Sequence, residues 1–235
     1  MTAEKTIQKA VKTIINLRET TNSPVHALIY GNWGVGKSYS AQKVAQKEKG
    51  VFYCKIPDGN ISKSKLIKII ALSAGAGYRH LYEGTFDLLK YHLLVNNYQH
   101  PIFIIDEAQR ILKSSLLMSE LKDLSEDPSL KFSYIFLGDH TTADIFKAHR
   151  HSLHKRILIK EKLQPLTEET IVEIAKEKGV EIDPKIILEV GKDKAWTTID
   201  IAFLFSYLSQ LLKVKKIELT KETIQEISKK LWKEE

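Results

Sequence analysis

The sequence predicts an α/β protein in which a parallel five-stranded sheet lies between layers of helices and a small helical bundle follows. Two observations point to this class. Five short runs of apolar and β-branched residues alternate with segments of helical periodicity, which is typical of a parallel sheet covered on both faces. Beyond residue 164 every apolar pattern is helical. A chain of 235 residues is long enough for a substantial core and a small appendage.

The elements of the α/β portion alternate in order. A helix over residues 3–20 carries an apolar stripe and stops at the breaker run TTNSP. The predicted strands are 25–30, 51–57, 101–106, 131–139 and 156–160. The helices between them are 38–50, 61–77, 85–99, 111–127 and 141–149. This alternation predicts three layers, with the sheet in the middle.

The tail has a different pattern. Its four helical segments are 168–179, 184–192, 198–214 and 220–232. The pattern changes at Gln164–Pro165, where the last strand gives way to a polar helix start. We therefore predict two domains, residues 1–164 with the sheet and its N-terminal helix, and residues 165–235 as a helical bundle.

Composition excludes several classes of protein. Hydrophobic residues make up 43% and charged residues 28% of the chain, as in ordinary globular proteins. The single cysteine, Cys54, cannot form an internal disulfide or a cysteine-rich metal site, which fits a reducing compartment. The N-terminus lacks the features of a secretory signal, and no run of about 18 apolar residues could span a membrane. We expect a cytoplasmic protein without a membrane partner.

The charge is unevenly distributed along the chain, whose net charge is +7. Residues 1–162 carry 24 basic and 15 acidic side chains, whereas residues 163–235 carry 12 and 14. A basic front portion favours a polyanionic partner, and nucleic acid before a membrane surface, because no basic helix with a Trp, Phe or Leu face is evident. Lysines that only keep the surface soluble are the alternative.

A glycine-rich segment between the first strand and the next helix carries the strongest functional pattern. GNWGVGKS fits the phosphate-binding pattern G-x-x-x-x-G-K-[ST] in the strand–loop–helix context that this pattern requires. Backbone N–H groups and a helix N-terminus cradle phosphates, the lysine reaches the β- and γ-phosphates, and the serine ligates Mg²⁺. A chance glycine loop is the alternative. The predicted nucleotide site consists of Gly31, Asn32, Trp33, Gly34, Val35, Gly36, Lys37, Ser38 and Tyr39.

A second pattern, PIFIIDEAQR, places Asp106 and Glu107 at the end of an apolar strand. A carboxylate at the carboxyl end of a strand beside a phosphate loop can hold Mg²⁺ through water, and a neighbouring one can polarise the attacking water. We assign the first role to Asp106, with Ser38 as the other metal ligand, and the second role to Glu107. The adjacent glutamate favours hydrolysis over transfer to a second substrate. Two acids that stabilise a helix N-terminus are the alternative.

Taken together, these segments resemble the AAA+ ATPases, and within them the transposition helpers of the MuB, TnsC and TniB type. The resemblance rests on GNWGVGKS, on FIIDEAQR, on YIFLGD as the sensor strand, and on the helical tail as the lid. It implies a P-loop AAA+ core with the strand order 5-1-4-3-2. It also implies ATP held between subunits, and rings or helical filaments on DNA.

The resemblance gives roles to further residues. Asp139 falls where such ATPases carry a polar sensor residue, although many relatives have Asn there and a charge near the γ-phosphate is unfavourable. Arg156, with Arg150 second, falls where they place the arginine that reaches a neighbour's nucleotide; a solvated surface arginine is the alternative. The lid normally supplies another arginine, but this chain has Thr197 and Thr198 there. The departure predicts slow turnover, with ATP acting as an assembly switch.

The segment after the second strand is the candidate DNA contact, with Lys63, Lys65 and Lys68 followed by Tyr78 and Arg79. In the resembling ATPases this region faces the central channel. Lys63, Lys65 and Arg79 would neutralise phosphates without reading bases, which gives salt-sensitive and sequence-tolerant binding. A helix whose lysines only face water is the alternative.

Two other groups of residues are not assigned to binding sites. Four histidines crowd one segment: His140, His149, His151 and His154. They suggest an exposed interface loop more than a zinc site, because no cysteine or well-spaced acid completes a ligand set. Four aromatic residues of the tail lie on helical patterns and are expected in its core, not on a base-stacking surface: Trp196, Phe203, Phe205 and Trp232.

The leading hypothesis is an AAA+ ATPase that uses ATP and Mg²⁺, assembles with copies of itself on duplex DNA, and hands that DNA to a transposase, with a target-selection protein as a further partner. A replication-initiator or helicase-loader ATPase is the close rival, since it uses the same core on DNA. A signalling or scaffold ATPase that binds no DNA is a third hypothesis. A nucleotide kinase is the weakest, because the tail offers no arginine to clamp a second phosphate substrate.

Overall fold

The computed structural model describes residues 2–21, 23–76, 85–98, 100–148, 152–164, 166–192, 196–214 and 217–232. The chain forms two compact units. The larger unit consists of Glu4–Gly31 and Lys37–Leu163. The smaller unit consists of Met1–Ala3, Asn32–Gly36 and Gln164–Glu235.

The larger unit is built on a five-stranded parallel sheet with the order β2-β3-β4-β1-β5. The strands are β1 (His26–Tyr30), β2 (Val51–Lys55), β3 (Ile102–Asp106), β4 (Ser133–Gly138) and β5 (Ile157–Lys162). The predicted order, counted from the other edge of the sheet as 5-1-4-3-2, is confirmed. Because the strands are parallel, the carboxyl ends of β1, β3 and β4 meet at one edge of the sheet, which is where α/β proteins bind ligands.

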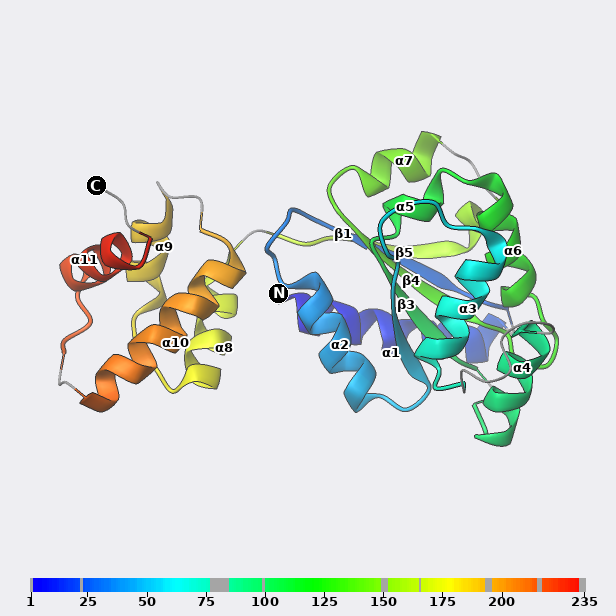
Figure 1. Ribbon diagram of the computed structural model, residues 1–235, viewed down its shortest axis with the longest axis horizontal. Helices are drawn as coiled ribbons and strands as arrows, with labels where there is room; N and C mark the ends of the chain where they lie inside the picture. Colours follow the sequence, from blue (N-terminus) through cyan, green and yellow to red (C-terminus); the bar gives the residue numbers. More distant parts are fainter. Residues whose placement is uncertain are drawn as a thin grey trace. The chain divides into compact units, whose positions relative to one another are not determined.

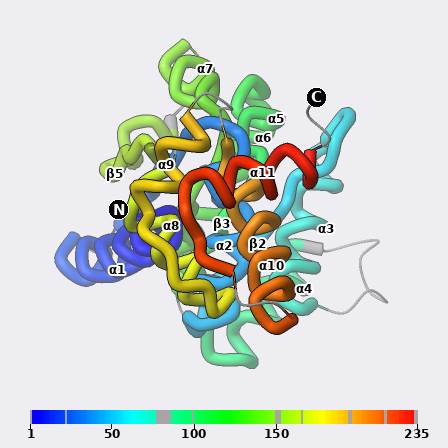
Figure 2. Tube along the Cα trace, turned by 90° about the vertical axis from the view of Figure 1, so that its left-hand side faces the viewer, coloured from blue at the N-terminus to red at the C-terminus, as the bar shows by residue number. Residues whose placement is uncertain are grey.

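Helices cover both faces of this sheet (Figures 1 and 2). They are α1 (Ala3–Thr21), α2 (Lys37–Lys47), α3 (Lys63–Ser73), α4 (Thr85–Val95), α5 (Gln109–Leu112), α6 (Ser115–Ser125), α7 (Thr142–Ala148) and the 3₁₀ helix η2 (Ser152–Arg156). The connection from β1 to β2 crosses the sheet in one direction, and the later connections run back. Right-handed crossovers therefore put α2 on one face and the helices from α3 to α7 on the other.

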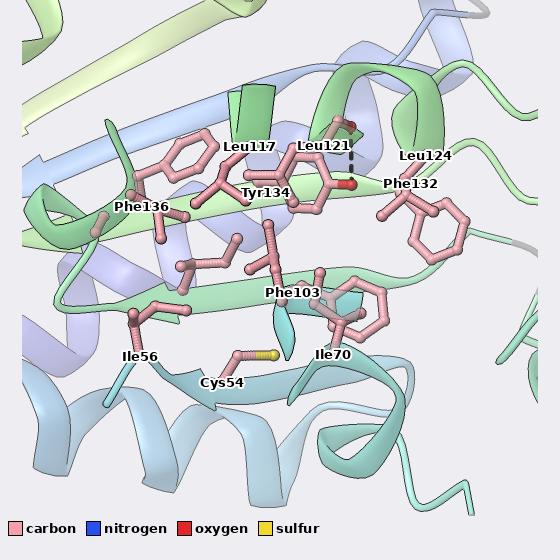
Figure 3. Packing of buried hydrophobic residues seen from close by; sticks show 14 of the residues in the cluster. Cys54, Ile56, Ile70, Phe103, Leu117, Leu121, Leu124, Phe132, Tyr134 and Phe136 are labelled. Carbon is pink, nitrogen blue, oxygen red and sulfur yellow. Dashed lines mark hydrogen bonds between the residues drawn. The ribbon is translucent and has the colours of Figure 1, made fainter. Parts of the chain in front are cut away.

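The face covered by α3, α4 and α6 holds a continuous apolar core (Figure 3). The rings of Phe103 and Phe132 stack with centroids 5.5 Å apart. The Tyr134 hydroxyl donates a hydrogen bond of 3.0 Å to the carbonyl of Leu121, so this buried polar group is satisfied. Cys54 lies in the same core and is 1% exposed.

The alternate strand residues are buried as well, which requires a second layer on the opposite face. Ala27, Ile29 and Ile104 are each fully buried. The helices α1 and α2 supply buried apolar side chains: Ile7, Ala10, Val11, Ile14, Ala41 and Val44. The near-continuous apolar composition of the strands thus results from burial on both faces.

The smaller unit contains α8 (Glu168–Lys178), α9 (Pro184–Lys192), α10 (Thr198–Val214) and α11 (Lys221–Trp232). Thr167 caps the start of α8, and Gly179 ends it in a left-handed conformation with φ of 66°. The four helices share an apolar cluster that includes Ile171, Ile187 and Phe205. No strand occurs in the described residues of this tail, 166–192, 196–214 and 217–232. None of the described helices is long and apolar enough to cross a membrane.

One expectation for the tail is wrong. Phe205 is buried, and the rings of Trp196 and Trp232 pack with centroids 5.3 Å apart at the edge of the cluster. Phe203 is instead 56% exposed. Residues two positions apart point to different sides of a helix, so α10 buries Phe205 and leaves Phe203 outside.

Candidate functional site

The loop between β1 and α2 has the backbone that the glycine pattern predicts. Gly34 and Gly36 have φ angles of 77° and 81°, which side chains other than glycine rarely adopt. The N–H of Gly31 donates to the Gly138 carbonyl at 3.3 Å. A Cβ atom at Gly31 would lie 3.0 Å from the Cβ and carbonyl oxygen of Leu163. These glycines are therefore required by the local geometry, and loops of this kind form anion-binding concavities.

Lys37 is the first residue of α2, and its side chain reaches back to Gly31 at the end of β1. Its Nζ atom donates to the Gly31 carbonyl at 2.8 Å. Burial lowers the pKa of Lys37, while the charges of Asp106, Asp139 and Glu107 act in the opposite direction. The structure therefore brings the lysine and three predicted acids into one electrostatic neighbourhood, although they are up to about 100 residues apart in sequence.

Asp106 ends β3 and is 2% exposed. Its Oδ1 atom accepts from the Glu107 N–H at 2.9 Å, and its Oδ2 atom accepts from the Tyr53 hydroxyl at 2.6 Å. The Ser38 side chain hydrogen-bonds to the same Tyr53 hydroxyl. The two predicted metal ligands, Ser38 and Asp106, thus share one hydrogen-bonding partner.

Tyr53, which lies on β2, is a site residue that was not predicted from the sequence. Burial raises its pKa above the ordinary value for tyrosine, and the hydrogen bond to Asp106 adds to that rise. Hydrogen bonds from Gln42 and Ser38 act in the opposite direction. No sequence pattern marks Tyr53, since VFYCK is an ordinary strand sequence. Only the pairing of β2 with β3 brings it to Asp106.

Lys37 and Ser38 at the start of α2 and Asp106 at the end of β3 have side chains that fit a nucleotide with Mg²⁺. Mg²⁺ prefers oxygen ligands in proteins. Ser38 supplies a hydroxyl oxygen and Asp106 a carboxylate oxygen, and both side chains are hydrogen-bonded to Tyr53. Lys37 supplies a cation beside the glycine loop. The three residues together have the chemistry of a site for a phosphate–metal complex.

Glu107 has a left-handed backbone, with φ of 59°. Such a conformation is uncommon for a residue other than glycine and is found at functional sites. The Oε2 atom of Glu107 accepts from Gln109 Nε2 at 2.8 Å and lies 3.4 Å from Arg110 Nη2. Arg110 also donates to the Ile56 carbonyl at 2.6 Å. Gln109 and Arg110 lie in the segment DEAQR, but no role was predicted for them from the sequence.

Asp139 follows β4 and caps the start of α7. Its Oδ1 atom accepts from the Thr141 N–H at 2.9 Å, from the Thr141 hydroxyl at 2.6 Å and from the Thr142 hydroxyl at 3.2 Å. Burial acts to raise the pKa of Asp139, but these hydrogen bonds outweigh it and the pKa lies below its usual range. These hydrogen bonds alone account for an aspartate at this position, so its presence does not require a role toward a nucleotide.

The arginine predicted to act on a neighbour's nucleotide lies at the opposite end of the strands from the glycine loop's attachment to β1. Arg156 directly precedes β5, whose first residue pairs with the first residue of β1, so it lies at the amino ends of the strands. Its Nη2 atom forms an ion pair with Glu126, and its Nη1 atom is buried without a hydrogen-bond partner. The second choice, Arg150, lies outside the described residues, as do His149 and His151.

The remaining loop residues differ in exposure. Trp33 is 66% exposed and Tyr39 is 53% exposed, with Lys43 Nζ 4.8 Å above the Tyr39 ring. Val35 is buried. Within the smaller unit the N–H of Thr198 donates to the Gly34 carbonyl at 2.9 Å. One of the two threonines at the position of the expected lid arginine, Thr198, therefore has a backbone contact to the glycine loop.

The candidate DNA contact begins at the start of α3. Lys63 pairs with Glu120 at 2.5 Å, Lys65 is exposed, and Lys68 is half-buried. The predicted contact Arg79, with the neighbouring Tyr78, lies outside the described residues. The described lysines place positive charge at the amino end of one helix.

Solved structures that share this fold include two ORC proteins of Aeropyrum pernix and RuvB of Thermotoga maritima. The ORC2 protein of Aeropyrum pernix, solved as ADPNP–ADP complexes, has a TM-score of 0.68 at 15% identity over 94% of this chain and 66% of that chain. The ORC1 protein of the same organism, in complex with DNA, has a TM-score of 0.60 at 13% identity over 95% and 64% of the two chains. The Holliday junction branch migration motor RuvB of Thermotoga maritima has a TM-score of 0.60 at 18% identity over 95% and 67%.

This chain spans 66% and 64% of the two Aeropyrum chains, which is less than two thirds of their length. Both of those chains therefore extend well beyond the shared region. No curated protein shows significant similarity to the sequence. Residues 21–146, more than half of the chain, match the family described as AAA domain. This match spans the glycine loop, Lys37, Asp106 and Glu107, and the chain belongs to the AAA domain family.

Proposed function

We propose that this protein is an ATPase that binds ATP with Mg²⁺ at the loop 31–38 and hydrolyses it slowly. Two observations carry the proposal: Lys37, Ser38 and Asp106 meet at the carboxyl ends of β1 and β3, and the loop that leads into Lys37 contains two left-handed glycines. Lys37 would exchange its bond to the Gly31 carbonyl for phosphate oxygens. Mg²⁺, held by Ser38 and Asp106, would neutralise charge on the phosphates when bound.

Glu107 is the proposed base that orients the attacking water. In the described structure Gln109 and Arg110 hold its Oε2 atom, and they would compete with the water for this oxygen. Asp139 is the proposed sensor residue and would share its carboxylate between Thr141 and the water. Arg156 is proposed to serve a neighbouring subunit, which requires release from Glu126. These requirements favour slow turnover and a role for ATP as an assembly switch.

The ATP-loaded protein is proposed to assemble with copies of itself on duplex DNA. Support comes from the basic front portion of the sequence and from the lysines at the start of α3. The transposition helpers that the sequence resembles suggest the finer role, in which the assembly passes target DNA to a transposase and a target-selection protein joins it.

Replication initiation or helicase loading is the second candidate function. The specific observation in its favour is the likeness to ORC structures of Aeropyrum pernix, of which one is a complex with DNA. Both candidates use the same nucleotide site and DNA contact. They differ in the protein that receives the DNA.

The decisive experiment measures fluorescence anisotropy of labelled duplex DNA at several salt concentrations with ATP, a slowly hydrolysed analogue, ADP or no nucleotide. We expect cooperative, ATP-dependent binding that weakens steeply with salt and ignores sequence. Lys37→Ala is the matched control, since it should lose the nucleotide dependence. Absence of DNA binding in every nucleotide state would move the protein to the scaffold class. Pull-down of a purified transposase or a replicative helicase by the DNA-bound assembly then separates the two candidates.

A further inference from the structure

The edge strand β2 brings a tyrosine hydroxyl to the metal ligands of the proposed site. Strand β2 pairs in parallel with β3, with Tyr53 opposite Ile104 and Lys55 opposite Asp106. Asp106 lies two residues beyond Ile104 on β3, and the Tyr53 side chain spans this separation. Its hydroxyl lies 2.6 Å from Asp106 Oδ2. This distance is short for a hydroxyl–oxygen hydrogen bond and is typical of a bond to a carboxylate.

The directions of the hydrogen bonds around Tyr53 follow from the proton inventory. A carboxylate only accepts, so the single proton of the Tyr53 hydroxyl goes to Asp106. The side chains of Ser38 and Gln42 meet the same oxygen, and they must therefore donate to it. A chain of donors thus runs from Ser38 through Tyr53 to Asp106.

This chain of hydrogen bonds has a consequence for Ser38. A serine that ligates Mg²⁺ must turn an oxygen lone pair to the metal and its proton elsewhere. Donation to Tyr53 gives that proton a fixed acceptor. At the same time the Tyr53 hydroxyl and the Glu107 N–H hold both oxygens of Asp106, which fixes the orientation of the carboxylate.

We propose that Tyr53 is a positioning residue for Mg²⁺, which orients the Ser38 hydroxyl and the Asp106 carboxylate through one hydrogen-bonded relay. This inference rests on the proposed nucleotide site. It adds a residue from the edge strand, outside both sequence patterns, that controls how much Mg²⁺ the site needs. Groups that hold metal ligands in place commonly change metal affinity about 10- to 100-fold when removed.

The experiment uses the full chain with Tyr53→Phe, which removes the hydroxyl and keeps the ring. Binding of a fluorescent ATP analogue is titrated with Mg²⁺, and separately in EDTA. We expect the Mg²⁺ concentration at half-maximal binding to rise about tenfold, while affinity in EDTA stays unchanged. Tyr98→Phe is the matched control. The Tyr98 ring packs on Phe52, with ring centroids 5.1 Å apart, and not on the metal ligands. Loss of its hydroxyl should therefore leave the titration unchanged.

Three outcomes are distinguishable. A wild-type protein that binds no ATP analogue at any Mg²⁺ concentration removes the proposed nucleotide site and the relay with it. Mg²⁺-dependent binding by the wild type with an unshifted midpoint in Tyr53→Phe overturns the relay alone. If Tyr53→Phe lowers the melting temperature but does not shift the Mg²⁺ midpoint, Tyr53 has only a structural role, and this result also overturns the relay. If Tyr53→Phe does not fold, Tyr53→Leu assayed in the cold must show the same raised midpoint.

Discussion

Arg110 holds Oε2 of Glu107 with its Nη2 atom at 3.4 Å, and the same guanidinium donates to the Ile56 carbonyl and pairs with Asp58 at 2.7 Å. The carboxylate proposed as the base is thus tied to the segment that leads from β2 toward the candidate DNA contact. We interpret these contacts as a resting arrangement, because Arg110 and Gln109 compete with the attacking water for the Oε2 atom.

Arg110→Ala should raise the basal rate of ATP hydrolysis. Loss of this partly exposed ion pair, worth about 1 kcal/mol, corresponds to a gain of about fivefold if it holds Glu107 back. Steady-state phosphate release in the absence of DNA measures the effect. Lys113→Ala, which removes an exposed cation three residues farther on, should leave the rate unchanged. A slower Arg110→Ala enzyme would mean that the guanidinium supports Glu107 during catalysis.

Glu107→Gln should preserve ATP binding and reduce hydrolysis about 100-fold or more, as expected when a positioned general base is removed. The amide keeps the size of the side chain and its hydrogen-bonding capacity toward Gln109. Single-turnover hydrolysis and equilibrium binding are measured on the same preparation. Asp123→Asn, the same change of charge at an exposed site on α6, is the control. Hydrolysis at the wild-type rate would assign the base to another residue.

Gly36→Ala should abolish tight nucleotide binding. Its φ of 81° lies in the left-handed region, where a Cβ atom costs about 1–2 kcal/mol, and relief of that strain changes the path of the loop. Gly59→Ala carries the same backbone strain, with φ of 91°, outside the loop. Both variants should lose similar stability in thermal melts, but only Gly36→Ala should lose binding. Equal binding by the two would show that the loop does not need this conformation.

The larger part of the fold follows from the sequence because both faces of the sheet are buried. Burial on both faces produces apolar runs such as IFIID, and the turns between them are marked by glycine and polar residues. The phosphate loop is recognisable for a related reason, since Gly34 and Gly36 adopt φ values that other residues avoid. In the strands and in the phosphate loop, the local structure restricts the residue type, to apolar residues in the strands and to glycine at positive φ angles.

The partners of the site residues could not be predicted in the same way. Tyr53 and Asp106 are 53 residues apart and meet only because β2 and β3 pair in one register. Arg110 follows Glu107 closely, but its use depends on the left-handed backbone at Glu107, which sequence does not reveal. The exposure of Phe203 shows the same limit, since helical periodicity over a largely apolar segment did not identify its buried side.

Lys65→Ala should weaken DNA binding uniformly across sequences and reduce the slope of log K against log salt by about one unit, if Lys65 meets one phosphate. Lys65 is exposed on α3 and its loss leaves the core intact. Anisotropy titrations with two unrelated duplexes measure both quantities. Lys176→Ala, an exposed lysine on α8, is the charge-matched control. An unchanged slope would exclude Lys65 from the interface.

Acidification should unfold the larger unit partly through His26. The ring is 0% exposed, and its Nδ1 atom accepts from the Tyr134 N–H at 3.1 Å. Burial, followed by the charges of Arg156 and Arg18, lowers the pKa of His26 to about 3, against 6.5 when unfolded. The unfolded chain therefore takes up a proton that the folded chain refuses, and stability falls as pH drops from about 6.5 toward 3.

The contribution of His26 to this loss is about 1.4 kcal/mol per pH unit. Urea unfolding at about pH 7.5 and about pH 5.5, followed by circular dichroism, measures it as the difference between the wild type and His26→Gln. The glutamine can still accept from the Tyr134 N–H and does not titrate. Parallel pH dependences in the two proteins would show that His26 is protonated in the folded state.

The burial of Cys54 decides how the protein can be labelled. The chain has no other cysteine, and burial raises the pKa of this thiol to about 12. A thiol that is both inaccessible and protonated reacts slowly with maleimides and disulfide reagents. A cysteine introduced on the surface could therefore carry a dye without removal of Cys54, and any reaction of Cys54 itself would report the rate at which the core around β2 opens.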